Sequence, residues 1–182
     1  PRLPSARAAA SERENVRFED EGFWVAVLPF KYSGGNPDVA ALAEGLSEEI
    51  VTGLSRFSYL KVLARAAEQT VMARYIISGS LRQSGSQLRL AVQLVDTISG
   101  AHVWAETYDR PFRAEDVFPL QDDLVPRIVS TVADWYGVLP QSMSELLRLK
   151  PSDRLTPYEA VLRSFGYGER RTPEEHATAR TV

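Results

Sequence analysis

Three consecutive segments decide the fold: YIISGSLRQSG (Tyr75–Gly85), QLRLAVQLVDTISG (Gln87–Gly100) and AHVWAETYDR (Ala101–Arg110). The second segment has the two-residue period of a strand with one apolar face, carried by Leu88, Leu90, Val92 and Leu94. Gly85 and Gly100 stand among polar turn residues, where glycine can take the positive φ that a tight reversal requires. The stretch therefore predicts three antiparallel strands joined by two tight turns.

Upstream of these strands, the sequence predicts a strand, a helix and a second strand. Phe23–Pro29 is a short apolar run that fits a buried strand, and Leu60–Arg65 is another. In Val39–Phe57, apolar residues recur every three or four positions, which indicates an amphipathic helix. Together they form one βαβ unit. Gly45 and Gly53 each cost about 1 kcal/mol relative to alanine inside a helix, so we expect them to let the helix approach the sheet closely.

The connection between this unit and the next strand is short. Ala66–Arg74 supplies nine residues, whereas a crossover between neighbouring parallel strands needs about a dozen or more. Three interpretations stay open: the strands on either side are antiparallel, they are not adjacent, or residues are absent between Ala66 and Arg74.

Downstream, apolar spacing predicts a long helix from Val117 to Trp135. Pro126 predicts a kink or a broken start in it, because proline removes a backbone donor and clashes with the preceding turn. Gly137 is placed to terminate this helix.

Further helices follow toward the carboxyl end. Pro140–Leu149 is predicted as a short helix with Ser142 and Glu145 as a capping box. Thr156–Tyr167 is predicted as a helix capped by Thr156, and another begins at Thr172. A pair of helices of this kind predicts a helical repeat array downstream.

Length, charge and composition limit the function classes. The chain has 182 residues, a net charge of -3 and no cysteine. The acidic balance argues against nucleic-acid binding, and the lack of cysteine excludes thiol chemistry and cysteine-ligated zinc. No apolar run approaches the roughly 20 residues of a membrane span. The chain begins at Pro1 without methionine, so we expect a piece of a longer protein, in which a membrane anchor is possible.

These patterns predict three parts of the chain. Residues 1–15 are small, charged and proline-containing, and are expected to be a flexible tail or linker. Residues 16–137 are expected to form an α/β (α+β) domain that contains about five strands. Residues 138–182 are expected to form a helical extension.

The turn between the first strand and the helix is a candidate ligand-binding or partner-binding site. Backbone N–H groups at the start of a helix can hold an anion. The turn has neither GxGxxG nor GxxxxGK[ST], so a plain connecting turn is the stronger interpretation. The candidate residues are Lys31, Ser33, Gly34, Gly35 and Asn36.

Large aromatic residues suggest a second candidate. Trp104, Tyr108 and His102 alternate on one predicted strand and could form a binding platform. Core packing under the Val117–Trp135 helix is the better interpretation of these side chains. The second histidine, His176, lies far along the chain, so the spacing indicates no metal site.

Two pairs of adjacent acidic residues are candidates for catalysis, Glu48–Glu49 and Asp122–Asp123. Neighbouring residues on a helix point about 100° apart, so neither pair is arranged for general acid–base catalysis. The sequence predicts no catalytic residue, no metal site and no cofactor.

Five segments resemble the TolB amino-terminal-like domain of bacterial multidomain proteins. They are VAVLPF (Val25–Phe30), ALAEGLSEEIVTGLSR (Ala41–Arg56), YIISGSLRQSG (Tyr75–Gly85), LRLAVQLVDTISGAHVWAETYDR (Leu88–Arg110) and LQDDLVPRIVSTVA (Leu120–Ala133). The resemblance implies an anticodon-binding-like α/β fold, in which a small mixed sheet of about five strands is flanked by helices. It implies no catalytic residues, and it implies tetratricopeptide repeats after the domain. It also implies a parent protein with a cyclase, kinase or winged-helix domain, in which this domain lies beyond a membrane span. The family has a longer stretch before YIISGS than this chain, which agrees with the short connection noted above.

Three hypotheses about function follow. The first is a non-catalytic interaction or sensor module of a bacterial signalling protein, binding a protein or peptide partner together with downstream repeats. The second is a small-ligand or nucleotide-binding regulatory domain of an adenylate or guanylate cyclase-type protein. The third is a structural spacer that could form a homodimer through a sheet edge. The expected location is periplasmic or extracytoplasmic, with the cytoplasm as the alternative.

Overall fold

The computed structural model describes residues 23–64 and 73–166. The strands are β1 (Trp24–Val27), β2 (Lys31–Tyr32), β3 (Lys61–Ala64), β4 (Tyr75–Ser84), β5 (Gln87–Asp96) and β6 (His102–Pro111). The helices are α2 (Pro37–Leu54), α3 (Val117–Ala133), α4 (Val138–Leu147) and α5 (Pro157–Phe165), with 3₁₀ turns at Ala114–Asp116 and Ser152–Arg154. The expected mixed α+β fold with a C-terminal helical portion is confirmed.

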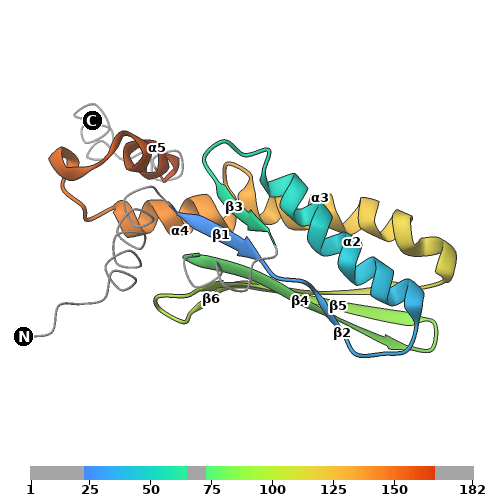
Figure 1. Ribbon diagram of the computed structural model, residues 1–182. Helices are drawn as coiled ribbons and strands as arrows, with labels where there is room; N and C mark the ends of the chain where they lie inside the picture. Colours follow the sequence, from blue (N-terminus) through green and yellow to red (C-terminus); the bar gives the residue numbers. More distant parts are fainter. Residues whose placement is uncertain (1–22, 65–72, 167–182) are drawn as a thin grey trace, which may run out of the picture.

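One sheet holds the strands together in the order β3-β1-β4-β5-β6, and β2 pairs with β4 beyond the end of β1. The sheet has six strands where about five were expected. Strands β4, β5 and β6 are the predicted antiparallel meander, with φ of 57° at Gly85 and 70° at Gly100 in its turns. Figure 1 shows α2 and α3 side by side over the sheet.

The βαβ unit is confirmed, because β1 and β3 are parallel and α2 connects them. The helix starts two residues before the predicted Val39 and ends at Leu54 rather than Phe57. Asn36 sets the earlier start, because its side chain accepts a hydrogen bond from the Asp38 N–H group.

The short connection after β3 is explained by the strand order. Strands β3 and β4 are not adjacent, because β1 lies between them and is parallel to both. The interpretation of non-adjacent strands is therefore confirmed and the antiparallel one is wrong, whereas the absence of residues between Ala66 and Arg74 stays a prediction. Residues 65–72 lie outside the described part of the chain.

The two glycines of α2 lie at a contact with α3, whereas a contact with the sheet was expected. A Cβ atom on Gly45 would stand 1.7 Å from the side-chain nitrogen of Gln121, and one on Gly53 would stand 2.7 Å from a methyl group of Val129. Both contacts are with α3. The glycines therefore permit close approach of two helices, and the expectation of a close approach to the sheet was wrong.

Helix α3 ends at Ala133, two residues before the predicted Trp135, and contains Pro126. Gly137 does not terminate it but precedes α4. The predicted capping box is also wrong, since α4 begins at Val138 and places Ser142 inside the helix. The Ser142 hydroxyl instead bonds the Tyr75 hydroxyl, at 2.9 Å.

The C-terminal helices pack on the same hydrophobic core as the sheet. Their contribution includes Leu139, Met143, Leu147, Leu162 and Phe165, each at most 5% exposed. Thr156 caps α5, as predicted, and it also forms a capping box with Glu159. The division at residues 137 and 138 stays a prediction, and the predicted tail at 1–15 and the helix at Thr172 lie outside the described residues.

Candidate functional site

In the part of the chain that the structure describes, the sheet edge beyond the end of β3 has no partner strand. Strand β3 ends at Ala64, opposite Val27, and no described strand continues along that side. The Leu28 N–H group donates to the Ile77 carbonyl of β4, at 2.9 Å. Val27 pairs with Ile77 and Lys31 pairs with Ser80, so four steps along this segment match three steps along β4, and the strand alternation is interrupted between Val27 and Lys31.

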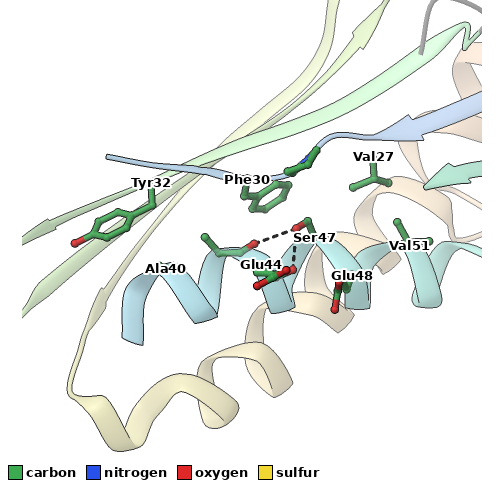
Figure 2. Close-up of a pocket in the computed structure, with 10 residues that line it drawn as sticks. Val27, Phe30, Tyr32, Ala40, Glu44, Ser47, Glu48 and Val51 are labelled. Carbon is green, nitrogen blue, oxygen red and sulfur yellow. Dashed lines mark hydrogen bonds between the residues drawn. The ribbon is translucent and has the colours of Figure 1, made fainter. Parts of the chain in front are cut away.

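A groove of about 360 Å³, which we call the edge groove, lies between this edge and α2. Its strand wall consists of Val27, Pro29, Phe30 and Tyr32. Its helix wall consists of Ala40, Ala43, Glu44, Ser47, Glu48 and Val51. Figure 2 shows Phe30 pointing from the strand toward α2. The surface inside is mainly apolar.

Small side chains on α2 keep the edge groove open. Ala40, Ala43 and Ser47 lie three or four residues apart, so they share the helix face that is turned toward Phe30. The Ser47 hydroxyl bonds the carbonyls of Ala43 and Glu44, at 3.0 and 2.8 Å (Figure 2). Its hydrogen-bonding capacity is thus used within the helix, and the groove floor behaves as an apolar surface.

The charges around the edge groove are unequal. Glu44 and Glu48 are exposed on the helix wall, one turn apart, and Lys31 is exposed beside the strand wall. Glu44 and Glu48 each have an interaction within the protein, so their exposure does not by itself make a cation site.

A second groove, of about 530 Å³, lies between α2 and α3, and we call it the helix groove. It is lined by Glu49, Asp122 and Asp134 among other residues. The adjacent acids Glu48 and Glu49 thus line different grooves, which agrees with the expectation that they do not act as a pair.

The predicted loop residues are held by contacts within the protein. The Asn36 side chain accepts from the Asp38 N–H group at 3.0 Å and donates to the Gln83 side-chain oxygen at 2.9 Å. The Asn36 N–H group donates to the Tyr32 hydroxyl at 3.3 Å. That hydroxyl lies 2.1 Å from where a Cβ atom of Gly34 would be. Since a carboxylate also occupies the first turn of α2, the geometry gives no support to an anion site, and the loop as a ligand site stays a prediction.

The structure does not bring Trp104 together with the candidate loop at Lys31–Asn36. It lies on β6 opposite Leu94, whereas Tyr32 pairs with β4, two strands away. Trp104 is partly buried against the core and Tyr108 is 7% exposed, as expected for core packing. His102 is exposed, so the expectation of one shared face was wrong for it. A register shift between Leu94 and Val95 is the reason, because it interrupts the alternation on β6.

The ionisable groups with shifted pKa values take part in structural contacts. Hydrogen bonds from Arg110 and Arg127, at 3.0 and 2.8 Å, lower the pKa of Asp123. Burial, and then the Glu106 carboxylate that accepts its hydrogen bond, raise the pKa of Tyr108. Within residues 23–64 and 73–166, no group of three histidine, cysteine, aspartate or glutamate side chains is placed to hold a metal ion.

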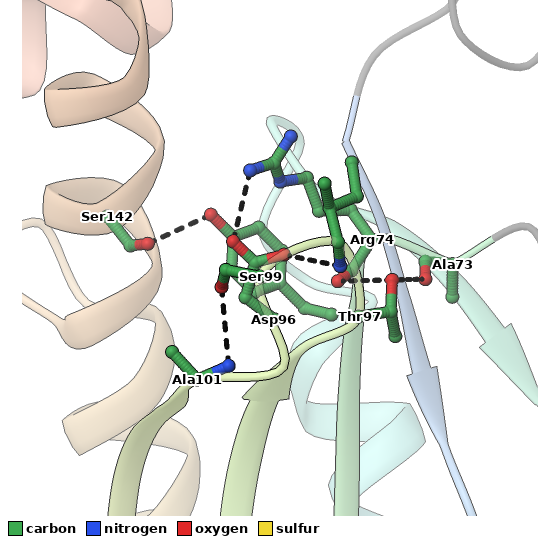
Figure 3. Close-up of polar contacts among 9 residues, drawn as sticks. Ala73, Arg74, Asp96, Thr97, Ser99, Ala101 and Ser142 are labelled. Atoms are coloured by element: carbon green, nitrogen blue, oxygen red, sulfur yellow. Dashed lines mark hydrogen bonds and ion pairs between the residues drawn. The ribbon is translucent and has the colours of Figure 1, made fainter.

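The LVDTISG turn also has a structural role (Figure 3). Asp96 accepts from the Ile98 N–H group and from the Arg74 guanidinium, both at 3.0 Å. The Thr97 hydroxyl bonds the Ala73 and Arg74 carbonyls, at 2.9 and 3.1 Å. These bonds hold the start of β4 against the β5–β6 turn. The LVDTISG motif therefore stabilises the fold.

Comparisons with known proteins give one sequence relative. No family model matches the chain. The chain is 34% identical over 122 residues to "Putative adenylate cyclase 3" of Rhizobium meliloti (strain 1021). The match covers 59% of this chain and 20% of the relative, so the chain spans about a fifth of the relative's length.

Solved structures with similar folds include three bacterial proteins. A PelC dodecamer from Paraburkholderia phytofirmans is 21% identical at a TM-score of 0.46, over 60% of this chain and 86% of that one. TolB from Acinetobacter baumannii is 16% identical at a TM-score of 0.39, and the match covers 57% of this chain and 29% of TolB. A lipoprotein from Neisseria meningitidis is 11% identical at a TM-score of 0.40, and the match covers 60% of this chain and 98% of the lipoprotein. No helix of the described residues has the length and apolar character needed to cross a membrane.

Proposed function

We propose that this chain is a non-catalytic interaction module of a bacterial multidomain signalling protein, and that it binds a protein or peptide partner. The observation that carries the proposal is the apolar edge groove, which lies beside a sheet edge that no strand of residues 23–64 and 73–166 covers beyond Ala64. Open edges recognise polypeptides by adding a strand, and adjoining pockets select the side chains.

The sequence relative supports a place in a cyclase-type protein. The chain matches about a fifth of that relative, so we propose that any cyclase chemistry belongs to another part of such a protein. Tetratricopeptide repeats downstream and a location outside the cytoplasm are further parts of the proposal, and both rest on the resemblance of the sequence to TolB-like domains.

A small-ligand or nucleotide site at Phe30–Asn36 is the weaker candidate, since the Asn36 N–H group already has an acceptor and Asp38 adds negative charge. We expect ATP and GTP to leave the melting temperature of the chain unchanged. A rise that depends on nucleotide concentration would favour the regulatory-domain hypothesis instead.

Self-association through a sheet edge stays a prediction, and we propose the outer edge of β6 for it. The strand is ten residues long, and in the described part of the chain only β5 pairs with it. Sedimentation velocity tests this: a dimer gives a mass that rises with concentration toward twice 20.3 kDa, and a constant 20.3 kDa contradicts it.

The experiment for the proposed function compares the chain with a variant whose groove is filled. Ala40 lines the edge groove and is exposed, so Ala40→Trp fills the space without disturbing the core. Both proteins are immobilised and exposed to extract of the bacterium that encodes them. We expect at least one protein that the unmodified chain retains and the variant loses. Identical captured sets, or turnover of a substrate in an activity screen, would contradict the proposal.

A further inference from the structure

We infer that the face of the sheet turned away from α2 and α3 binds an acidic segment of a partner protein. The side chains that would hold it are Lys31, Arg82 and Arg89, which we call the basic row. The inference goes beyond the proposed function, which places partner binding at the edge groove on the side that α2 covers. It follows from the strand register, the ion pair on this face and the distribution of charge over the domain.

The strand register brings the basic row together. Arg82 of β4 pairs with Arg89 of β5. Lys31 of β2 pairs with Ser80, which is two residues before Arg82 on the same strand. Paired residues point to the same face of a sheet, as do residues two apart along a strand. Leu81 points into the core beneath the helices, so the three cations point to the opposite face, which no described helix covers (Figure 1).

The three exposed cations are unequally neutralised. Asp109, opposite Arg89 on β6, accepts two hydrogen bonds from its guanidinium, at 2.6 and 3.0 Å. Among the described residues, Lys31 and Arg82 form no ion pair, although Arg82 stands directly opposite the like charge of Arg89. Like charges in directly opposite positions destabilise a sheet. Because local arrangements that cost stability are typical of functional sites, the unneutralised cations indicate a ligand with negative charge.

The geometry of this face favours a carboxylate as the anionic group. The contact of Arg89 with Asp109 shows that a carboxylate here meets a guanidinium with both of its oxygen atoms. Arg82 carries the same group on the adjacent strand, beside a hollow of about 290 Å³ that it lines together with Gln87 and Arg89. A planar guanidinium suits two parallel hydrogen bonds to a carboxylate. A carboxylate of the partner would therefore lie over Arg82, with Lys31 available for a second one.

The distribution of charge limits the size of the anionic ligand. The chain has a net charge of -3, and the exposed acids Glu49 and Asp122 lie on the helical side of the domain. Asp109 is the one acidic residue that the described strands direct to the uncovered face. A broad anionic surface, such as a membrane or a nucleic acid, would be repelled by these groups. A short acidic segment can lie over β2 and β4 alone, away from the carboxylate of Asp109 on β6.

The test is selection of a displayed library of random nonapeptides on the folded chain. We expect the enriched peptides to contain at least two aspartate or glutamate residues. Synthetic peptides of the enriched sequences are then titrated against two charge variants. Arg82→Gln removes a charge of the basic row, and Arg56→Gln makes the same change in net charge at the helix groove. Both arginines are exposed, so neither change disturbs the core.

We expect Arg82→Gln to weaken peptide binding by about fivefold or more, and Arg56→Gln to change it by less than about twofold. Asp109→Asn should strengthen binding, because it removes the repelling carboxylate and leaves Arg89 able to bind a second one. Equal effects of Arg82→Gln and Arg56→Gln, or enrichment of peptides without acidic residues, would overturn the inference.

Two further measurements separate this inference from its alternatives. Binding of the chain to phosphatidylserine vesicles that is lost in Arg82→Gln, without enrichment of acidic peptides, would overturn it in favour of a lipid surface. Ala40→Trp should bind the acidic peptides as tightly as the unmodified chain, because Ala40 lies in the edge groove. Loss of peptide binding in Ala40→Trp would overturn the assignment to the uncovered face, whereas the capture experiment with the same variant tests the edge groove separately.

Discussion

Phe30 lies directly over Gly79. A Cβ atom built on Gly79 would stand 2.8 Å from two carbon atoms of the Phe30 ring. Gly79 occupies the middle of β4, where glycine costs stability relative to a residue with a side chain. The contact explains its presence, because the missing side chain leaves room for the ring that forms the strand wall of the edge groove.

Gly79→Ala is expected to destabilise the fold by about 1–3 kcal/mol, since the rigid ring of Phe30 must move away from the added methyl group. Urea unfolding measures the change. The double variant Gly79→Ala, Phe30→Leu removes the clash and should be less destabilised than the sum of the two single variants. Simple additivity would show that the two residues do not interact in this way.

Gly53→Ala tests the contact between α2 and α3. Alanine normally stabilises a helix by about 1 kcal/mol relative to glycine. Here the new methyl group would meet Val129 at 2.7 Å, so we expect destabilisation. In a Val129→Ala background the clash is absent, and adding Gly53→Ala should raise the free energy of unfolding by about 1 kcal/mol. The same sign of effect in both backgrounds would contradict the close approach.

The Arg74–Asp96 pair predicts a dependence of stability on pH. Burial raises the pKa of Asp96, but the bonds from the Ile98 N–H group and Arg74 outweigh it and hold the pKa below its ordinary value. A lowered pKa in the folded state stabilises the protein above the unfolded pKa of about 3.9, and this contribution is lost as the pH falls through the folded value. We expect Asp96→Asn to cost about 2 kcal/mol at pH 7 and less at pH 2.

The control for this prediction is Asp109→Asn. Asp109 pairs with Arg89 at 2.6 Å, but both side chains are more than half exposed, so water and salt screen the pair. Its effect on the free energy of unfolding should be much smaller than that of Asp96→Asn at pH 7. A loss for Asp96→Asn that does not shrink on acidification would show that the ion pair is not the cause.

The start of α5 gives a local test. The Thr156 hydroxyl accepts from the Glu159 N–H group at 3.2 Å, and Glu159 accepts from the Thr156 N–H group at 2.9 Å. Thr156→Ala should cost about 1 kcal/mol in thermal or urea unfolding. Thr156→Ser retains the hydroxyl and should stay close to the unmodified chain. An equal cost for both variants would rule out the cap as the reason.

Much of the fold could be predicted because the patterns are local. The alternation in Gln87–Asp96 and the helical spacing in Pro37–Leu54 each reflect one buried face, which the sequence carries by itself. The errors arose where a pattern has two meanings. Ser142 and Glu145 have capping-box spacing, but the same spacing fits the interior of α4. Gly45 and Gly53 indicated a close contact, but not which element makes it.

The edge groove could not be predicted, because it depends on where separate elements stop. It exists because β3 ends opposite Val27 and because α2 turns its small side chains toward Phe30. Neither fact has a local signature. β2 was missed for a similar reason, since its two residues lie in a segment rich in turn residues and pair only with the distant β4.

The most direct test of the central claim is photo-cross-linking in the living bacterium, with a benzophenone amino acid at one position of the full-length protein. Ala40 lies in the edge groove, and Thr107, exposed on β6, provides the matched control. If this chain is a partner-binding module that uses the groove, a discrete protein adduct forms from position 40 and not from position 107. An adduct of equal yield at both positions, or none at position 40, would contradict the account.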